Sequence, residues 1–251
     1  LCPEDDGPGG HVYAGCVATA MSMIMYYWRY PLNGEGQHTS YGSPEYGPLT
    51  VNFGNTYYQW DGMKDVIDNN NPVPIAEIMY HCGVAVDMMY SPDGSGAYSY
   101  QVPSRLNAYF RYHSSVHIQK SGYSQTAWIN LLKSELDNGF PMYYSGQSTS
   151  GGHAFVCDGY QGDNFHFNFG WSGSGNGFFS VNSVGGFNSF QAIVRNFVPS
   201  DTDYPYHASG LTTITKPSGS FTDGSGPVED YLDDANASWL IDPQNAQDSI
   251  K

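Results

Sequence analysis

The chain has 251 residues, with 9 Lys and Arg against 24 Asp and Glu, and a formal net charge of −15. This balance argues against nucleic acid as a partner, because phosphate binding requires a clustered electropositive surface. The longest mainly apolar stretch, residues 14–28, is interrupted by Gly, Ser and Thr. It is also shorter than the roughly 20 apolar residues that a membrane-spanning helix needs, so we expect no membrane insertion.

The composition is typical of an extracellular, loop-rich protein. There are 30 Gly and 21 Tyr, and only 13% of the residues are charged. The four cysteines are widely spaced and form no Cys-x-x-Cys pair, so we expect neither a disulfide framework nor a structural metal site, and no cofactor. The chain opens without Met or a leader-like segment, and we expect it to be a piece of a longer product.

Residues 1–138 show the pattern of helices joined by long loops. From Cys16 to Tyr30 apolar residues recur at helical spacing, and Pro31 ends the run. Further helices are predicted at 56–67, 74–82, 102–112 and 125–136, the last of which is followed by the stop signal Asn138-Gly139.

After Gly139 the pattern changes to short aromatic and β-branched runs separated by Gly, Asn and Asp turns. These runs predict strands at 140–145, 153–160, 164–170, 177–182 and 190–197, arranged as an antiparallel meander. Helices first and strands second indicate the α+β class. Residues 201–251, with 9 acidic and 2 basic residues and a Ser-Gly-rich segment, predict a linker leading into a second module.

Cys16 is the candidate nucleophile. It follows Gly15 and opens the first predicted helix, where unpaired backbone amides and the helix dipole favour a thiolate. A lone cysteine in such a small-residue setting is more often a buried apolar residue. A catalytic role therefore requires a base elsewhere in the chain.

His153 is the best candidate for that base. It follows Gly151-Gly152 at the start of a predicted strand, 137 residues after Cys16, and papain-type enzymes place their histidine about 130–150 residues after the cysteine. The other seven histidines are expected to be ordinary surface or core residues: His11, His38, His81, His113, His117, His166 and His207.

A histidine base needs an orienting group, and Asn168 comes one turn and one strand later, just before Phe169-Gly170-Trp171. An Asn side-chain carbonyl can accept an imidazole N–H, and Trp171 can shield that bond from water. An Asn beside Gly can also be a simple turn residue. The pairing with Cys16 and His153 favours the catalytic interpretation.

Three segments of the chain resemble signatures of the streptopain family of secreted bacterial cysteine peptidases. They are Gly15-Cys16-Val17-Ala18-Thr19-Ala20, Gly152-His153-Ala154-Phe155-Val156 and Asn168-Phe169-Gly170-Trp171. The resemblance extends loosely over residues 1–198. It implies a papain-like fold that is helical in its first half and an antiparallel sheet in its second.

The resemblance also implies roles for the site residues. Cys16 would be the nucleophile and His153 the general base, with Asn168 and Trp171 holding the imidazole. Gly15, Gly151 and Gly152 would border the oxyanion site and the substrate cleft.

Two features of this chain depart from the family pattern. Phe169 stands where many members have Trp, and no Gln precedes Cys16 to bind the oxyanion. The loss of one such donor costs about 10²–10³ in rate.

The resemblance predicts a secreted or cell-surface endopeptidase made as a zymogen, with protein or peptide substrates and a propeptide or proteinaceous inhibitor as partners. The tail resembles the start of a CUB-like β-sandwich, so the expected organisation is a peptidase domain at 1–199, a linker at 200–217 and a truncated module at 218–251. Two alternatives remain open: an acyl or γ-glutamyl transferase with the same residues, and a catalytically impaired binding module.

Overall fold

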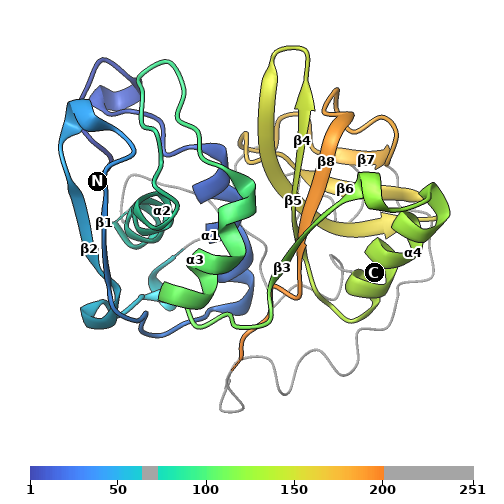
Figure 1. Cartoon of the computed structure of the whole chain (residues 1–251), viewed down its shortest axis with the longest axis horizontal. Helices are drawn as coiled ribbons and strands as arrows, with labels where there is room; N and C mark the ends of the chain where they lie inside the picture. Colours follow the sequence, from blue (N-terminus) through green and yellow to red (C-terminus); the bar gives the residue numbers. More distant parts are fainter. Residues whose placement is uncertain (64–72, 201–251) are drawn as a thin grey trace.

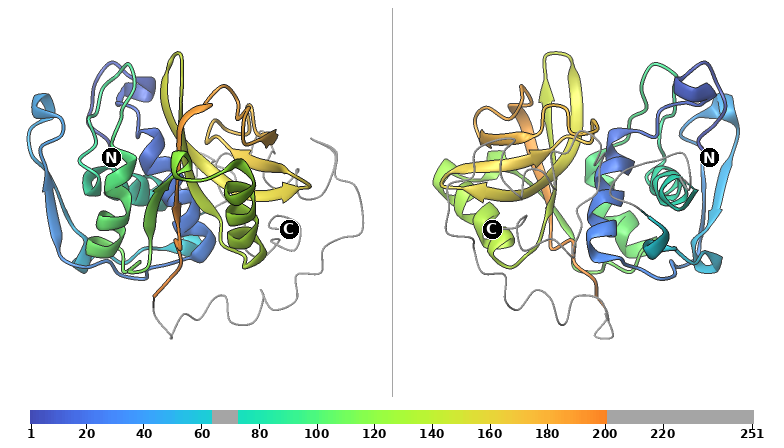
Figure 2. Two further views of the ribbon diagram at one scale, coloured as in Figure 1. Left: turned by 45° about the vertical axis from the view of Figure 1, so that its right-hand side comes forward. Right: turned by 180° about the vertical axis from the view of Figure 1, so that it is seen from behind.

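Two halves of different secondary structure lie side by side in the computed structural model, which describes residues 1–63 and 73–200 (Figure 1). The first half is mainly helical and the second is a twisted antiparallel sheet with one covering helix. Views from two further directions show the same separation (Figure 2). This arrangement confirms the predicted α+β class, with helices first and strands second.

Helix α1, Cys16–Trp28, is the central element of the helical half. Every residue from Val17 to Trp28 except Thr19 is buried, as expected for a helix that is apolar on all sides and is enclosed by other elements. It ends at Arg29, which adopts the left-handed conformation with a φ of 49°. The helix thus provides a rigid, enclosed support for its first residue, Cys16.

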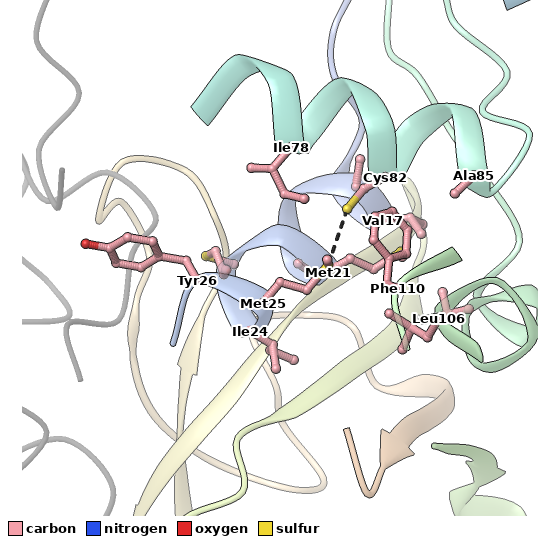
Figure 3. Packing of buried hydrophobic residues seen from close by; sticks show 14 of the residues in the cluster. Val17, Met21, Ile24, Met25, Tyr26, Ile78, Cys82, Ala85, Leu106 and Phe110 are labelled. Atoms are coloured by element: carbon pink, nitrogen blue, oxygen red, sulfur yellow. Dashed lines mark hydrogen bonds between the residues drawn. The ribbon is translucent and has the colours of Figure 1, made fainter. Parts of the chain in front are cut away.

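The remaining elements of the helical half surround α1. Helix α2, Val73–Ala85, packs against it, and Cys82 Sγ lies 3.6 Å from Met25 Sδ in this contact (Figure 3). Helix α3 spans Val102–Tyr109, and strands β1, Gln37–Ser40, and β2, Leu49–Asn52, form a small antiparallel pair. Five short 3₁₀ turns lie among these elements in the described residues, and a sixth, Lys120–Gly122, lies in the other half.

The second half is a six-stranded sheet with the order β3-β8-β4-β5-β6-β7. Its strands are β3 Val116–Gln119, β4 Met142–Ser148, β5 Gly151–Gln161, β6 Asn164–Asn168, β7 Gly177–Ser180 and β8 Ser189–Arg195. Strands β4 to β7 form the predicted meander. Strand β8 then returns to the other side of β4 and pairs with β3.

The two faces of this sheet pack against different partners because side chains alternate along a strand. Tyr143 and Val156 belong to the core shared with α1, whereas Tyr144 and Phe155 face the core under helix α4, Gln125–Asp137. We call these the α1 face and the α4 face. Trp128 of α4 donates its indole N–H to the Tyr144 hydroxyl at 3.3 Å.

Some elements of the structure differ from those that the apolar spacing of the sequence predicts. The helix predicted at 56–67 is wrong over its described part, because residues 56–63 contain only the 3₁₀ turn Trp60–Gly62. Strands β1, β2 and β3 were not predicted. The linker and the truncated module expected at 200–251 lie outside the described residues apart from Ser200. No helix in 1–63 or 73–200 is both long and apolar enough to span a membrane.

Candidate active site

Cys16 is the first residue of α1 and lies at the junction of the two halves. Its N-terminal neighbour Gly15 has a φ of 88°, and a Cβ there would lie 2.6 Å from the Met88 side chain. Only glycine avoids both the conformational strain and this close contact. Gly15 therefore allows the chain to turn abruptly into the helix and leaves Cys16 half-buried at its start.

The thiol of Cys16 is in an environment that favours its neutral form. Burial raises its pKa, while hydrogen bonds from the backbone amides of Ala154, Val17 and Cys16 itself act in the opposite direction. The helix start was expected to lower this pKa, and the net shift is upward because desolvation outweighs the amides. The contact with Ala154 also joins Cys16 to strand β5 of the other half.

His153 lies near the start of β5, opposite Gly146 of β4. Its Nε2 is 2.9 Å from the main-chain carbonyl oxygen of Phe169. Because a carbonyl oxygen only accepts hydrogen bonds, Nε2 carries the proton and Nδ1 of the neutral ring has the free lone pair. Burial lowers the pKa of His153, so the imidazole is held in this basic, uncharged form.

Aromatic rings surround the imidazole. Trp171 stacks on it with 4.6 Å between ring centroids and an angle of 21°, and Phe187 lies 5.1 Å away. Phe155 and Phe169 complete the set. Trp171 is 48% exposed, so its outer face is open to solvent while its inner face covers His153.

The contact predicted between Asn168 and His153 does not form. The Asn168 Oδ1 accepts the Gly170 N–H at 2.9 Å, and its Nδ2 is buried without a hydrogen-bond partner among the described residues. The reason is the strand register. Asn168 pairs with Val156, which faces α1, and His153 lies three residues from Val156 on the opposite face.

Phe169, the next residue, provides the orienting group through its main chain instead. Its carbonyl oxygen accepts from His153, and its own N–H donates to Asn176 Oδ1 at 2.8 Å. Asn176 thus holds the main chain on the N-terminal side of Phe169, while the peptide unit whose carbonyl contacts His153 is held at its Gly170 N–H by Asn168 Oδ1. Reasoning from the sequence missed Phe169 and Asn176 because a main-chain acceptor carries no side-chain signal.

Two cavities meet at His153 and Gly152. The first, of about 400 Å³, is also lined by Cys16, and we call it the cysteine-side cavity. The second, of about 580 Å³, is lined by Trp171 and by the hairpin tip that contains Gly151, and we call it the tryptophan-side cavity. Gly151 has a φ of 137° and a Cβ on it would meet no atom within 4 Å, so its surface is open to a substrate backbone.

The remaining cysteines and several histidines have structural settings. Cys82 and Cys157 are fully buried, and burial raises the pKa of both. His38 pairs with Asp87 at 2.7 Å and His166 with buried Asp158 at 2.6 Å. Within 1–63 and 73–200, no group of three or more His, Cys, Asp or Glu side chains could hold a metal ion.

The fold is of the papain-like class, with a cysteine and a histidine lining one cavity between its two halves. The chain belongs to the Peptidase C10 family, which its residues 1–179 match. It is 35% identical over 219 residues to streptopain from Streptococcus pyogenes serotype M28, an alignment that covers 78% of this chain and 55% of the relative. The chain thus spans about half the length of that protein.

A second relative and a solved structure agree with this membership. A thiol protease/hemagglutinin, PrtT, from Porphyromonas gingivalis is 32% identical over 216 residues, covering 78% of this chain and 25% of the relative. The structure of active wild-type interpain A, a cysteine protease from Prevotella intermedia, superposes with a TM-score of 0.72 at 34% identity, covering 80% of this chain and 88% of that one.

Proposed function

We propose that this chain is a cysteine endopeptidase domain in which Cys16 is the nucleophile and His153 the general base. One observation carries the proposal. Cys16 from the helical half and His153 from the sheet half line the same open cavity, and the backbone of Ala154, next to His153, contacts the thiol. Membership of the Peptidase C10 family supports the same activity.

The chemistry follows from the neutral state of both groups. As Cys16 Sγ attacks the scissile carbonyl carbon, His153 Nδ1 takes the thiol proton, and the Cys16 N–H faces the developing oxyanion. His153 then gives this proton to the leaving amine, which departs as the C–N bond breaks. Water, deprotonated by the same Nδ1, attacks the remaining thioester and releases the acid and the thiol.

The shape of the site fits an extended polypeptide. The cysteine-side and tryptophan-side cavities continue one another past His153, so residues on both sides of a scissile bond have space. The glycines at 151, 152, 185 and 186 line this path, and they let a substrate backbone approach closely. Neither the transferase nor the binding-module alternative has a comparable observation in its favour.

Secretion and synthesis with a propeptide are part of the proposal. The low charged fraction and high Gly and Tyr content support an extracellular location. A propeptide is supported by the similarity to a fragment of prointerpain A from Prevotella intermedia, 31% identical with a TM-score of 0.71 and covering 80% of this chain and 67% of that one.

Labelling with a peptidyl epoxide, followed by peptide mapping, tests the nucleophile because the four cysteines serve as internal controls. We expect one rapid adduct on Cys16 that is lost in His153→Ala. Cys16→Ala should abolish casein hydrolysis, whereas Cys2→Ala, a half-buried thiol that lines neither cavity, should retain it. Hydrolysis that persists in Cys16→Ala would overturn the assignment.

A further inference from the structure

The cysteine-side cavity extends well beyond the nucleophile, along the α1 face of the sheet. Ala154 of β5 pairs with Ser145 of β4, Ser145 with Ala192 of β8, and Ala192 with Gln119 of β3. All four line the cavity. Paired residues on neighbouring strands share a face, so this row is the floor of the cleft, and its three small members leave the space above it open.

His117 stands at the far end of this floor. It lies two residues before Gln119 on β3, and therefore on the same face, opposite Val194. Its side chain is half-buried and makes no hydrogen bond to any described residue. Gln119, the next residue along β3 on the same face, also lines the cavity without a side-chain hydrogen bond in the described part of the chain.

No acidic side chain and no Lys or Arg lines this cavity. Its titratable groups besides His117 are Cys16, His153 and the hydroxyls of Tyr98 and Tyr100. The nearest arginine on β8, Arg195, pairs with Val116 and thus projects from the other face, where it binds Glu135 at 2.7 Å. On α3, which packs near β3, Arg105 is bound to Asp87 at 2.6 Å. His117 is therefore the one group lining the far end that can become a cation.

We propose that His117, with Gln119, forms a substrate subsite that binds a carboxylate side chain. A protonated imidazole has only hydrogen-bond donors, the Gln119 amide can turn its NH₂ group towards the same carboxylate, and no anionic side chain lines the cavity. Helix α1 and the loop that contains Tyr98 form the facing wall, so the substrate side chain would be partly shielded from water.

The strand order sets which substrate residue reaches this subsite. Ala154, whose backbone contacts Cys16, is separated from Gln119 by three strand spacings. Because neighbouring strands lie about 4.8 Å apart, the two residues are roughly 14 Å apart. An extended peptide advances by about 3.3 Å per residue. The carboxylate should thus belong to a residue about three or four positions from the scissile bond.

This inference rests on the proposed peptidase activity, but binding tests it without turnover. The probes are acetylated octapeptide amides in pairs, and the two members of a pair differ only in having Glu or Gln at one position. The set covers the positions on both sides of the scissile bond. Each peptide is titrated into the Cys16→Ala variant. We expect the Glu peptide with the residue three or four positions away to bind about 5- to 10-fold more tightly than its Gln counterpart at pH 5.5. The difference should fade by pH 8, because burial lowers the pKa of His117 and the imidazole is then neutral.

The variant His117→Gln should remove both the Glu preference and its pH dependence, while the matched control His113→Gln, an exposed histidine outside the cavity, should keep them. Equal affinity for Glu and Gln peptides at every position, or tighter binding of apolar residues at that position, would overturn the subsite. Failure of the wild-type chain to cleave any of these peptides would instead overturn the proposed function, since the binding result stands separately.

Discussion

Each half of the molecule encloses a histidine among aromatic rings, and the two differ in their access to solvent. His81 of α2, in the helical half, is 8% exposed and packs among Tyr58, Phe53 and Tyr80. His153, in the sheet half, is also enclosed by aromatic rings but lines two cavities. Burial lowers the pKa of both, and that of His81 to about 4.

The difference lies in access to solvent and in the hydrogen-bond partner. His81 Nδ1 is 3.1 Å from the Tyr58 hydroxyl, a side chain that is itself buried. His153 is held at Nε2 by a main-chain carbonyl, which leaves Nδ1 for chemistry. A lowered histidine pKa therefore does not by itself identify a catalytic base, and the exposed lone pair is the distinguishing feature.

The largest effect that we predict concerns His81 and acid stability. Its folded pKa of about 4 lies below the unfolded value of about 6.5, so the unfolded state binds more protons between these values. Stability is thus complete above the unfolded pKa and falls as the pH drops towards 4. The expected loss from this group at pH 4 is about 3 kcal/mol.

Urea unfolding of the wild type and of His81→Gln at pH 7.5 and pH 4 measures this contribution, because other titrating groups are common to both proteins. The variant keeps a hydrogen-bond acceptor for Tyr58 and should lose less stability on acidification by about 2–3 kcal/mol. Parallel losses in the two proteins would show that His81 is not a buried neutral imidazole.

The next prediction separates Asn176 from Asn168. Asn176→Ala removes the acceptor for the Phe169 N–H and loosens the main chain of the residue whose carbonyl oxygen contacts His153. We expect kcat to fall about 10-fold with KM unchanged, and Asn176→Asp, which keeps an acceptor oxygen, to restore most of it.

Asn168→Ala should lower both stability and rate. Its buried side chain accepts from the N–H of Gly170, which belongs to the same peptide unit as the Phe169 carbonyl oxygen that contacts His153. We therefore expect the thermal midpoint to fall together with kcat, whereas Asn176→Ala should leave the thermal midpoint closer to that of the wild type. An unchanged kcat in Asn168→Ala would show that this peptide unit needs no side-chain anchor.

These two asparagines also show how far the sequence could lead. The periodicity of α1 and the meander from β4 to β7 were predictable because apolar spacing there is strong and local. Strand β3 was not, since β8, the strand with which it pairs, is far away in the chain. For the same reason His117 was judged an ordinary histidine, although β8 and β4 bring it into the cysteine-side cavity.

The positions of the site residues also depend on the strand register, which the sequence does not reveal. Cys16 and His153 were assigned from motif and spacing, and both line the same cavity. Asn168 was assigned on adjacency alone, but a shift in pairing between Cys157 and Gly159 and the alternation of faces direct its side chain away from His153. A one-residue change of register exchanges the faces of a strand, and no local pattern in the sequence reports it.

The smallest effect that we predict concerns Trp171 and the pH dependence of His153. Trp171→Ala removes the ring that stacks 4.6 Å from the imidazole and exposes it to water. Because burial lowers the pKa of His153, exposure should raise it towards its ordinary value. The acid limb of kcat/KM, which reports protonation of the proposed base, should therefore move to higher pH by about half a unit. Trp171→Phe should retain most of the shielding and shift the limb less.

The control is Tyr41→Ala, which removes an exposed aromatic side chain of the helical half and should leave the pH profile unchanged. An acid limb that stays in place or moves to lower pH in Trp171→Ala would mean that the solvent shielding of His153 comes from Phe187 and Phe155 rather than from the tryptophan.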